Sequence, residues 1–348
     1  MPATRRVWPP RDAKPLLVNQ LVRLHKISEQ EDPRPPEDEM ALLWYSNDDD
    51  RQAWSAALRR LEPDLDIRVH TDPGNIGDIE AALVWLPPPG MLAGLPNLKA
   101  IFSLAAGVDA MLGDPSLPAD VPLCRMIDRS LTDGMTEFVL ARVLHYHRDM
   151  HIYAAQQRRA EWKLHLPRPP FERRVGVMGL GELGTATARR LVANGFSVSG
   201  WSRSRRDVEG VTCHAGSEAF GTFLEDVEIV ICLLPLTKET EGLLDDRFFR
   251  ALPEGAFLVH VGRGRQLVPG ALLGALESGQ LAAATIDVTP DEPLDPASPL
   301  WRHPGIDITP HTASYCHPTT AAENVIANLR RLRRGEPLEG VVDRSRGY

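Results

Sequence analysis

The sequence predicts an α/β fold made of two doubly wound domains, in which helices cover both faces of a parallel sheet. Short apolar runs typical of buried strands alternate with amphipathic segments along most of the chain. A glycine-rich loop directly follows one of these runs. The chain is also long enough for two hydrophobic cores, with 348 residues and 43% apolar composition.

The first 38 residues do not share this alternation. They are rich in Pro, Arg and Glu, and their one regular feature is a stripe of Leu17, Leu21 and Leu24 at helical spacing. We interpret residues 1–38 as an N-terminal arm and leave two readings open. The arm is either a partly disordered tail or a helix docked on a partner subunit.

The first series of strands and helices starts at Ala41 and contains helix-like segments such as 51–61. Its apolar runs predict strands over 41–45, 81–86 and 98–104. A long amphipathic stretch, 132–154, follows, and the Pro-punctuated segment 162–170 then leads into the next series. We interpret the amphipathic stretch as a helix that connects two domains.

The second series is a longer alternation of the same kind. Its apolar runs predict strands over 175–178, 196–201, 230–234, 256–261, 283–288 and 306–309. Helical patterns lie between most of these runs, which is typical of a doubly wound sheet. The amphipathic closing segment, 318–334, is expected to cross back and complete the first domain, so that the second domain is an insertion.

The composition limits the partners and the location of the protein. The formal charge of −8 is spread without a basic block, which argues against nucleic acid as a partner. No apolar run reaches the roughly 20 residues of a membrane span, and the N-terminus lacks the apolar core of a signal peptide. Scattered cysteines without a Cys-x-x-Cys pair indicate reduced thiols; they are Cys124, Cys213, Cys232 and Cys316. We expect a cytoplasmic protein with no metal site.

The loop Gly179-Leu180-Gly181-Glu182-Leu183-Gly184 lies between a predicted strand and a predicted helix over 182–193. In such a loop the first glycine permits a tight turn and the second lets the backbone approach a pyrophosphate. The third lets the helix pack closely on the strand. Amides at the helix N-terminus can hold the phosphates. We expect these residues to bind a dinucleotide, with an ordinary strand-to-helix turn as the alternative.

The second strand of this half ends at Trp201 and is followed by Ser202, Arg203 and Arg205. A site that prefers NAD has Asp or Glu at this place, where the carboxylate accepts from the ribose hydroxyls. The acid is missing here, and guanidinium groups can bind a 2′-phosphate. The sequence therefore predicts NADPH and NADP rather than NAD, with a solvated basic turn as the alternative.

Three further segments carry candidate catalytic residues at the carboxyl ends of predicted strands, where ligands bind in open α/β sheets. Arg263 stands between two glycines, and its fork can clamp a carboxylate and polarise a carbonyl. Glu292 lies in a Pro-flanked loop, and His311 follows Thr-Pro. A carboxylate beside an imidazole raises the pKa of the imidazole, so Glu292 and His311 together would supply a protonated acid near neutral pH. Each residue alone has the alternative of an ordinary loop side chain.

With these segments in place, the sequence resembles the D-isomer-specific 2-hydroxyacid dehydrogenases, and within them the glyoxylate/hydroxypyruvate reductase A group. The resemblance runs from about Ala41 to Tyr348. Besides the glycine loop, it includes 104–109, 234–237, 263–264, 287–288, 292–294, 309–311 and 342–348. We predict a Rossmann cofactor domain inserted in a flavodoxin-like substrate domain. The cofactor domain is placed at 141–312, and the substrate domain at 39–140 plus 313–348.

The resemblance implies a role for each catalytic candidate. Arg263 would anchor the carboxylate and carbonyl of the substrate. His311 would act as general acid, and Glu292 would support it. The backbone amides of Ala106 and Gly107 would complete the carboxylate site from the first domain.

The resemblance also implies residues that bind the cofactor, and the position of one tryptophan suggests a residue that shapes the pocket. Asp287 would accept from the nicotinamide carboxamide, while Leu234 and Pro235 would wall the cofactor. Trp85 ends a strand of the first domain and would narrow the substrate pocket, with core packing as its alternative. For Asp109 we expect a loop-bracing role rather than a catalytic one.

The predicted function is NADPH-dependent reduction of small 2-oxo acids such as glyoxylate and hydroxypyruvate. The resemblance implies a homodimer joined through its cofactor domains. Two alternatives stay open. One is another dehydrogenase of this family, of phosphoglycerate, formate or D-lactate type, and the other is a non-enzymatic nucleotide-sensing protein. The sequence departs from the family at His260, Gly262 and Thr289, where Asn, Ala and an aromatic residue are usual. None of these departures removes a group that does chemistry.

Overall fold

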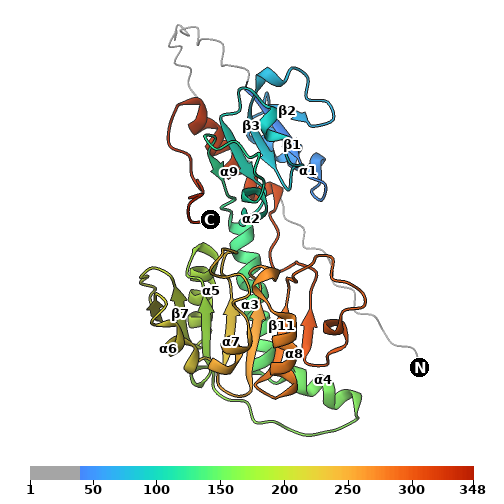
Figure 1. The fold of residues 1–348 in the computed structure, drawn as a ribbon, viewed down its shortest axis with the longest axis vertical. Helices are drawn as coiled ribbons and strands as arrows, with labels where there is room; N and C mark the ends of the chain where they lie inside the picture. Colours follow the sequence, from blue (N-terminus) through green and yellow to red (C-terminus); the bar gives the residue numbers. More distant parts are fainter. Residues whose placement is uncertain (1–39) are drawn as a thin grey trace, which may run out of the picture. The chain divides into compact units, whose positions relative to one another are not determined.

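A computed structural model of the chain describes residues 40–348, and the predicted N-terminal arm over 1–38 lies outside the described residues. The described strands form two separate sheets, of five and seven strands, whose ladders are all parallel (Figure 1). The predicted fold class is therefore confirmed. None of the helices within this part of the chain is long and apolar enough to cross a membrane.

The five-stranded sheet has the order β2-β1-β3-β4-β5. This is the flavodoxin-like order, in which the chain winds outward from its first strand. The strands are β1 (Ala41–Tyr45), β2 (Asp66–Val69), β3 (Ile79–Val84), β4 (Ala100–Ser103) and β5 (Leu123–Cys124). A short helix, α2 (Asp109–Leu112), follows β4.

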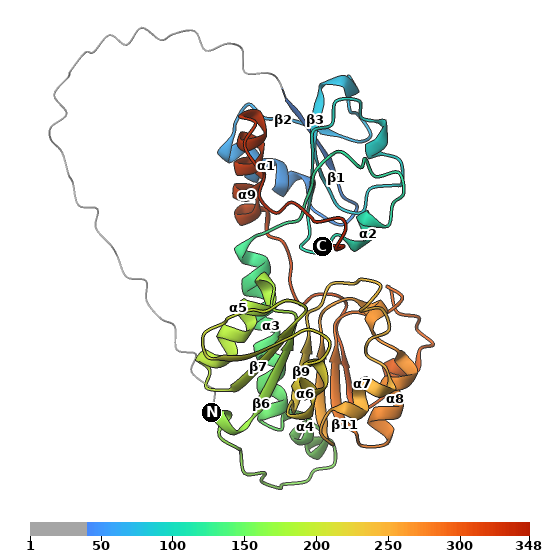
Figure 2. The same ribbon diagram turned by 60° about the vertical axis from the view of Figure 1, so that its left-hand side comes forward.

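Helices α1 (Arg51–Leu61) and α9 (Pro318–Arg333) lie side by side on this sheet (Figure 2). α1 begins after Asp50, whose carboxylate accepts from two first-turn amides at 2.8 and 3.2 Å. Trp54 of α1 and Leu329 of α9 are fully buried in one core cluster. Burial of the leucine alone contributes about 2 kcal/mol. The closing segment thus returns to the first sheet, as predicted.

The seven-stranded sheet has the order β12-β11-β10-β9-β6-β7-β8, which is the Rossmann order with one further strand at the edge. Its strands are β6 (Arg174–Met178), β7 (Ser197–Ser202), β8 (Val211–Ala215), β9 (Ile229–Cys232), β10 (Ala256–His260), β11 (Leu281–Ile286) and β12 (Ile306–Ile308). Helices α5 (Glu182–Ala193), α6 (Phe220–Glu225), α7 (Asp246–Ala251) and α8 (Pro269–Glu277) connect them.

The stretch 132–154, expected as one helix, forms two helices, α3 (Arg129–His147) and α4 (Met150–Arg158). Asp149 between them has a φ of 56°, in the left-handed region, and a residue in this conformation ends a right-handed helix. The prediction of one continuous helix was wrong because neither Gly nor Pro marks the break.

Strands β2, β5 and β8 were not among the predicted runs. β2 and β8 are edge strands of their sheets, and none of their residues is fully buried. Because an edge strand is less completely covered, its sequence is not the continuous apolar run that marks an interior strand. β5 has two residues, which is too short for any periodicity.

The chain crosses between the two sheets twice, at the start of α3 and at residues 313–317 before α9. The two crossings are hydrogen bonded to each other, since Ser314 Oγ donates to Leu131 O at 2.6 Å. Asp128, the N-cap of α3, also accepts from Thr320 Oγ1 at 2.9 Å. The crossings therefore form one bonded junction.

Candidate active site

Two glycines of the loop after β6 are required by the protein itself. Gly179 has a φ of 101°, a conformation that L side chains rarely adopt. A Cβ at Gly184 would lie 1.7 Å from the carbonyl oxygen of Gly179, so only glycine lets α5 pack this closely on the loop. The predicted tight turn and close helix packing are both present.

Gly181 differs from these two glycines. A Cβ there would meet no heavy atom within 4 Å, and its φ of −78° is accessible to any residue. Gly181 lines a cavity at the N-terminus of α5, where free backbone amides and the helix dipole attract an anion. The loop therefore leaves open space where a phosphate of a dinucleotide fits.

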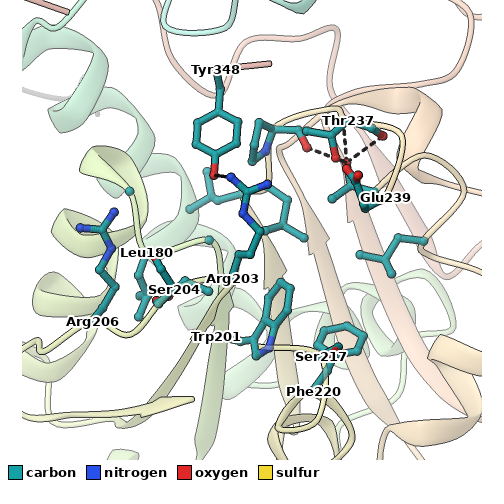
Figure 3. A pocket seen from close by; sticks show the side chains of 18 residues that line it. Leu180, Trp201, Arg203, Ser204, Arg206, Ser217, Phe220, Thr237, Glu239 and Tyr348 are labelled. Atoms are coloured by element: carbon teal, nitrogen blue, oxygen red, sulfur yellow. Dashed lines mark hydrogen bonds between the residues drawn. The ribbon is translucent and has the colours of Figure 1, made fainter. Parts of the chain in front are cut away.

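The cavity has a volume of about 510 Å³ and is lined by the glycine loop, the end of β7 and the loop after β9 (Figure 3). Trp201 and Phe220 line it with ring centroids 4.7 Å apart, and Trp201 Nε1 donates to Gly216 O at 2.9 Å. Leu234 and Pro235, predicted to wall the cofactor, also line it. A cavity with apolar walls and a few polar groups is typical of a cofactor site.

The residues after β7 give the cavity its positive charge. Arg203 and Arg206 line it, and no acidic residue directly follows the strand. Ser202 lines it too, but is buried, and its hydroxyl donates to Ser204 O at 2.8 Å. Arg205, predicted to bind the 2′-phosphate, is exposed and is not among the lining residues, whereas Arg206 is.

The other residues predicted to bind the cofactor but absent from the cavity lining are Glu182, Leu183, Gly184 and Asp287. Leu183 is partly buried against two hydrophobic core clusters. Gly184 serves the packing of α5 on the loop. A contact between these residues and a cofactor stays a prediction.

Arg263 follows β10 and lies against a loop of the other sheet. Its Nε donates to Asp109 Oδ1 at 2.8 Å, and its Nη1 donates to Gly262 O at 2.9 Å. A Cβ at Gly107 would lie 1.3 Å from Arg263 Nη2, so the guanidinium lies directly on the Gly107 backbone. The structure thus brings Arg263 to the loop that contains Ala106 and Gly107.

Buried polar residues hold the Arg263 loop. Gln266 Oε1 accepts from Arg263 N at 2.9 Å, and its Nε2 donates to two carbonyl oxygens of the loop after β9 at 3.0 and 2.9 Å. Burial lowers the pKa of His260 to about 4, so the neutral ring donates from Nε2 to Arg263 O at 3.0 Å. A Cβ at Gly262 would lie 2.4 Å from Gln266 Oε1. Glycine at this position therefore makes room for Gln266.

His311 and Glu292 form the predicted pair. His311 Nδ1 lies 2.8 Å from Glu292 Oε2, and the side chains are 46% and 40% exposed, so both are accessible. The hydrogen bond to Glu292 raises the pKa of His311 above its usual range, against the opposing effect of burial. Burial acts to raise the pKa of Glu292, but the hydrogen bond and charge of His311 outweigh it and lower that pKa. The pair thus favours a protonated imidazole beside a carboxylate.

Asp287 organises the loop that carries His311. Its buried carboxylate accepts from Thr309 Oγ1 at 2.6 Å, Thr312 N at 2.8 Å and Ala313 N at 2.9 Å. His311 has a φ of 55°, which costs a non-glycine residue about 1–3 kcal/mol and must be held by its surroundings. The structure shows Asp287 bracing this loop, while its contact with nicotinamide stays a prediction.

The loops after β10 and β11 touch each other. A Cβ at Gly264 would lie 1.8 Å from Thr289 O, so the backbones are in direct contact there. As a smaller contribution, the charge of Arg263 lowers the pKa of both His311 and Glu292. The three catalytic candidates therefore share one site.

Trp85 is partly buried against the core of the five-stranded sheet, as its alternative reading expected. Its narrowing of a substrate pocket stays a prediction. Sequence reasoning did not select Gln266 or Tyr348, and it gave Asp109 no link to Arg263. Asp109 and Tyr348 end segments that the sequence had already singled out, 104–109 and 342–348, but the sequence gave Tyr348 no role at the cavity.

The Rossmann order of the larger sheet, with the cavity at its glycine loop, defines the class of the protein as a dinucleotide-dependent oxidoreductase. In a comparison with protein families, the family described as "D-isomer specific 2-hydroxyacid dehydrogenase, NAD binding domain" matches residues 140–313. The chain belongs to the D-isomer specific 2-hydroxyacid dehydrogenase family. The resemblance recognised in the sequence is confirmed.

Relatives span nearly all of the described chain. Glyoxylate/hydroxypyruvate reductase A of Serratia proteamaculans is 41% identical over 314 residues, which are 89% of this chain and 100% of the relative. A family member from Xanthobacter autotrophicus, solved with NADPH and MES, is 44% identical with a TM-score of 0.87, covering 89% of this chain and 99% of its own. The NADPH-dependent glyoxylate/hydroxypyruvate reductase of Sinorhizobium meliloti, solved with NADP and sulfate, is 35% identical with a TM-score of 0.83, covering 88% and 100%.

Substitution of two glycines should separate dinucleotide binding from folding. We expect Gly181→Ala to melt within about 2 °C of the parent and to bind NADPH at least about tenfold more weakly, because its methyl group enters the phosphate space. Gly184→Ala should lose about 3 kcal/mol or more of stability, because its Cβ meets the Gly179 carbonyl. Thermal unfolding and fluorescence titration measure both effects. Unchanged NADPH affinity in Gly181→Ala would contradict the assignment of the loop.

Proposed function

We propose that the protein reduces small 2-oxo acids of the glyoxylate and hydroxypyruvate class to 2-hydroxy acids with NADPH. The observation that carries the proposal is the His311–Glu292 pair beside Arg263, at the strand ends of a Rossmann sheet. The names of the Serratia and Sinorhizobium relatives support the substrate class. The Xanthobacter relative solved with NADPH supports the cofactor.

Arg263 and the loop of the substrate domain bind the substrate carboxylate. A guanidinium binds a carboxylate through two parallel hydrogen bonds, and it also offsets negative charge that develops on an adjacent carbonyl oxygen. Arg263 Nη2 lies on the backbone of Gly107. We therefore assign the backbone amides of Ala106 and Gly107 to the same carboxylate site.

His311 supplies the proton. Because Nδ1 is bonded to Glu292 Oε2, the transferable proton is held at Nε2, which gives it to the substrate carbonyl oxygen as that oxygen becomes a hydroxyl. Bound NADPH supplies the hydride for the carbonyl carbon. Glu292 then keeps the neutral imidazole in a single tautomer, and the exposed ring regains its proton from water.

The charge of the cavity supports NADPH over NADH. Arg203 and Arg206 line the cavity where an NAD site has a carboxylate. We keep Ser202 and Arg203 as cofactor-binding residues and add Arg206 beside the exposed Arg205. The absent carboxylate disfavours an NAD-linked dehydrogenase of phosphoglycerate, formate or D-lactate type. The complete catalytic set disfavours a nucleotide-sensing protein.

We also propose a homodimer joined through the cofactor domains. Large apolar side chains between α4 and β6 are exposed, namely Trp162 at 104%, Leu164 at 74%, Leu166 at 83% and Phe171 at 68%. Apolar groups exposed together on a surface mark interaction sites. We take a second copy as the partner, because the family resemblance implies a homodimer joined through the cofactor domains.

The remaining proposals concern domain limits and location. The proposed cofactor domain, 141–312, lies within one residue of the family match over 140–313 at each end. The substrate domain is 39–140 plus 313–348. We propose a cytoplasmic location, which is supported by free thiols at all four cysteines of the described chain.

The proposed function is tested by following NADPH and NADH oxidation against glyoxylate, hydroxypyruvate, pyruvate and phenylpyruvate. We expect turnover of the first two with NADPH, and a kcat/KM at least about tenfold lower with NADH, because the guanidiniums then lose their phosphate partner. His311→Ala should lower kcat about 10²-fold or more. Comparable kcat/KM for both cofactors would overturn the cofactor assignment. Near-full activity of His311→Ala would overturn the general acid.

Glu292→Gln should shift the pH dependence of reduction. Reduction needs protonated His311, so kcat/KM falls as the pH rises through the pKa of that residue. In the parent protein this pKa lies above the ordinary value of 6.5, and the carboxylate of Glu292 is the main cause. Loss of the carboxylate lowers the pKa, so the descending limb of the profile should move to lower pH. An unmoved limb would mean that a different group titrates.

Asp109→Ala should reveal how far its carboxylate orients Arg263. We expect kcat/KM for glyoxylate to fall about tenfold, the size of one charge-assisted hydrogen bond in a partly exposed site. Asp109→Asn should have a smaller effect, because its amide oxygen still accepts from Nε. Thermal unfolding serves as the control for folding. A rise in kcat/KM would instead mean that Asp109 mainly competes with the substrate for the guanidinium.

A further inference from the structure

The segment after α9 is bonded to the substrate domain along its length. Arg125 N donates to Gly340 O at 2.9 Å, and Val342 N donates to Leu123 O at 2.8 Å, so this segment runs antiparallel beside β5. Arg344 Nη2 then donates to two carbonyl oxygens of the loop before β5, at 2.8 and 2.6 Å. The path of the chain toward residue 348 is therefore fixed by several hydrogen bonds.

A closed turn sets the position of Tyr348. Asp343 accepts from Ser345 N at 3.0 Å through its side chain and from Arg346 N at 3.0 Å through its carbonyl oxygen. Its own backbone N–H donates to Tyr348 O at 3.2 Å. Because the two ends of this turn are joined, the ring of Tyr348 starts from a defined backbone position.

Tyr348 lines the cofactor cavity and contacts Arg203 there (Figure 3). Arg203 Nη2 donates to the Tyr348 hydroxyl at 2.6 Å, and the guanidinium carbon lies 5.3 Å from the centre of the tyrosine ring. This combines a hydrogen bond with a cation–π contact. Within residues 40–348 the Arg203 side chain has no other hydrogen bond and no ion pair. Tyr348 is thus what orders this guanidinium.

Order at Arg203 matters because the cavity also contains an acidic group. Glu239 lines the cavity, and a hydrogen bond from Thr237, together with the charge of Arg203, keeps the pKa of its carboxyl below the usual range. A carboxylate in this position attracts the mobile side chain of an arginine and repels a phosphate. A guanidinium held by Tyr348 keeps its remaining N–H groups for an incoming anion.

We propose that Tyr348 is a positioning residue for cofactor specificity: it holds Arg203 in the orientation that receives the 2′-phosphate of NADPH. The inference rests on the proposed use of NADPH. The tyrosine hydroxyl accepts from Arg203, so its own proton is left to donate to a phosphate oxygen. In this arrangement the last segment of the substrate domain completes a site whose other residues belong to the cofactor domain.

The test uses binding of two small probes to the full chain, measured by calorimetry. 2′,5′-ADP carries the phosphate that Arg203 would receive, and 5′-AMP lacks it. We expect Tyr348→Ala to weaken 2′,5′-ADP about tenfold, the size of one hydrogen bond with one exposed cation–π contact, and to change 5′-AMP less than about twofold. Tyr348→Phe keeps the ring and should lie between the parent and the alanine variant. Tyr153→Phe, which removes a hydroxyl bonded to His165 O outside the cavity, is the matched control.

A double-mutant cycle shows whether Tyr348 acts through Arg203. In an Arg203→Ala background, Tyr348→Ala should produce no further loss of 2′,5′-ADP affinity. Equal weakening of both probes, or additive losses in the cycle, would overturn the inference, as would an unchanged 2′,5′-ADP affinity in Tyr348→Ala. If the parent itself binds both probes equally, the proposed NADPH preference fails and the inference fails with it. Thermal unfolding of each variant identifies any loss that comes from misfolding.

Discussion

The contact between the Arg263 guanidinium and the Gly107 backbone joins the two halves of the molecule at the place where the chemistry is proposed. Only glycine permits such a close approach, so the loop of one sheet and the strand end of the other are matched in shape. Behind Arg263, the buried residues Gln266 and His260 fix its backbone through hydrogen bonds. The proposed carboxylate site therefore takes its groups from segments that follow strands of both sheets.

Each charged group around this contact has its own partner. Asp109 pairs with Arg263, Glu292 pairs with His311, and the amides of the following loop satisfy Asp287. In the proposed function a substrate carboxylate shares the guanidinium with Asp109, which lowers the affinity for the substrate. In return, the cation is already oriented before the substrate binds, so less conformational entropy is lost on binding.

The sequence predicted a shared position for the catalytic candidates because they stand at strand ends, which a doubly wound fold gathers at one edge whatever the loops between them. Interior strands were predicted since burial on both faces produces continuous apolar runs, whereas the edge strands β2 and β8 lack them. Arg206 lines the cavity and Arg205 does not. The sequence could not predict this difference, because it depends on a loop conformation that no periodic pattern encodes. The contact of Tyr348 with Arg203 joins residues 145 positions apart, so it depends on the complete path of the chain.

The junction of the two crossings has a mechanical consequence. The two connections are adjacent and are bonded through Ser314 and Leu131. Such a pair of connections is a double hinge, whose axis is the line that joins them. Rotation about that line changes only a few backbone torsions, while sliding or twisting strains one connection against the other. We therefore expect relative motion of the two sheets to be mainly a rotation about that line. Because Arg263 contacts Asp109 and Arg203 contacts Tyr348, such a rotation would change the separation of both pairs at once.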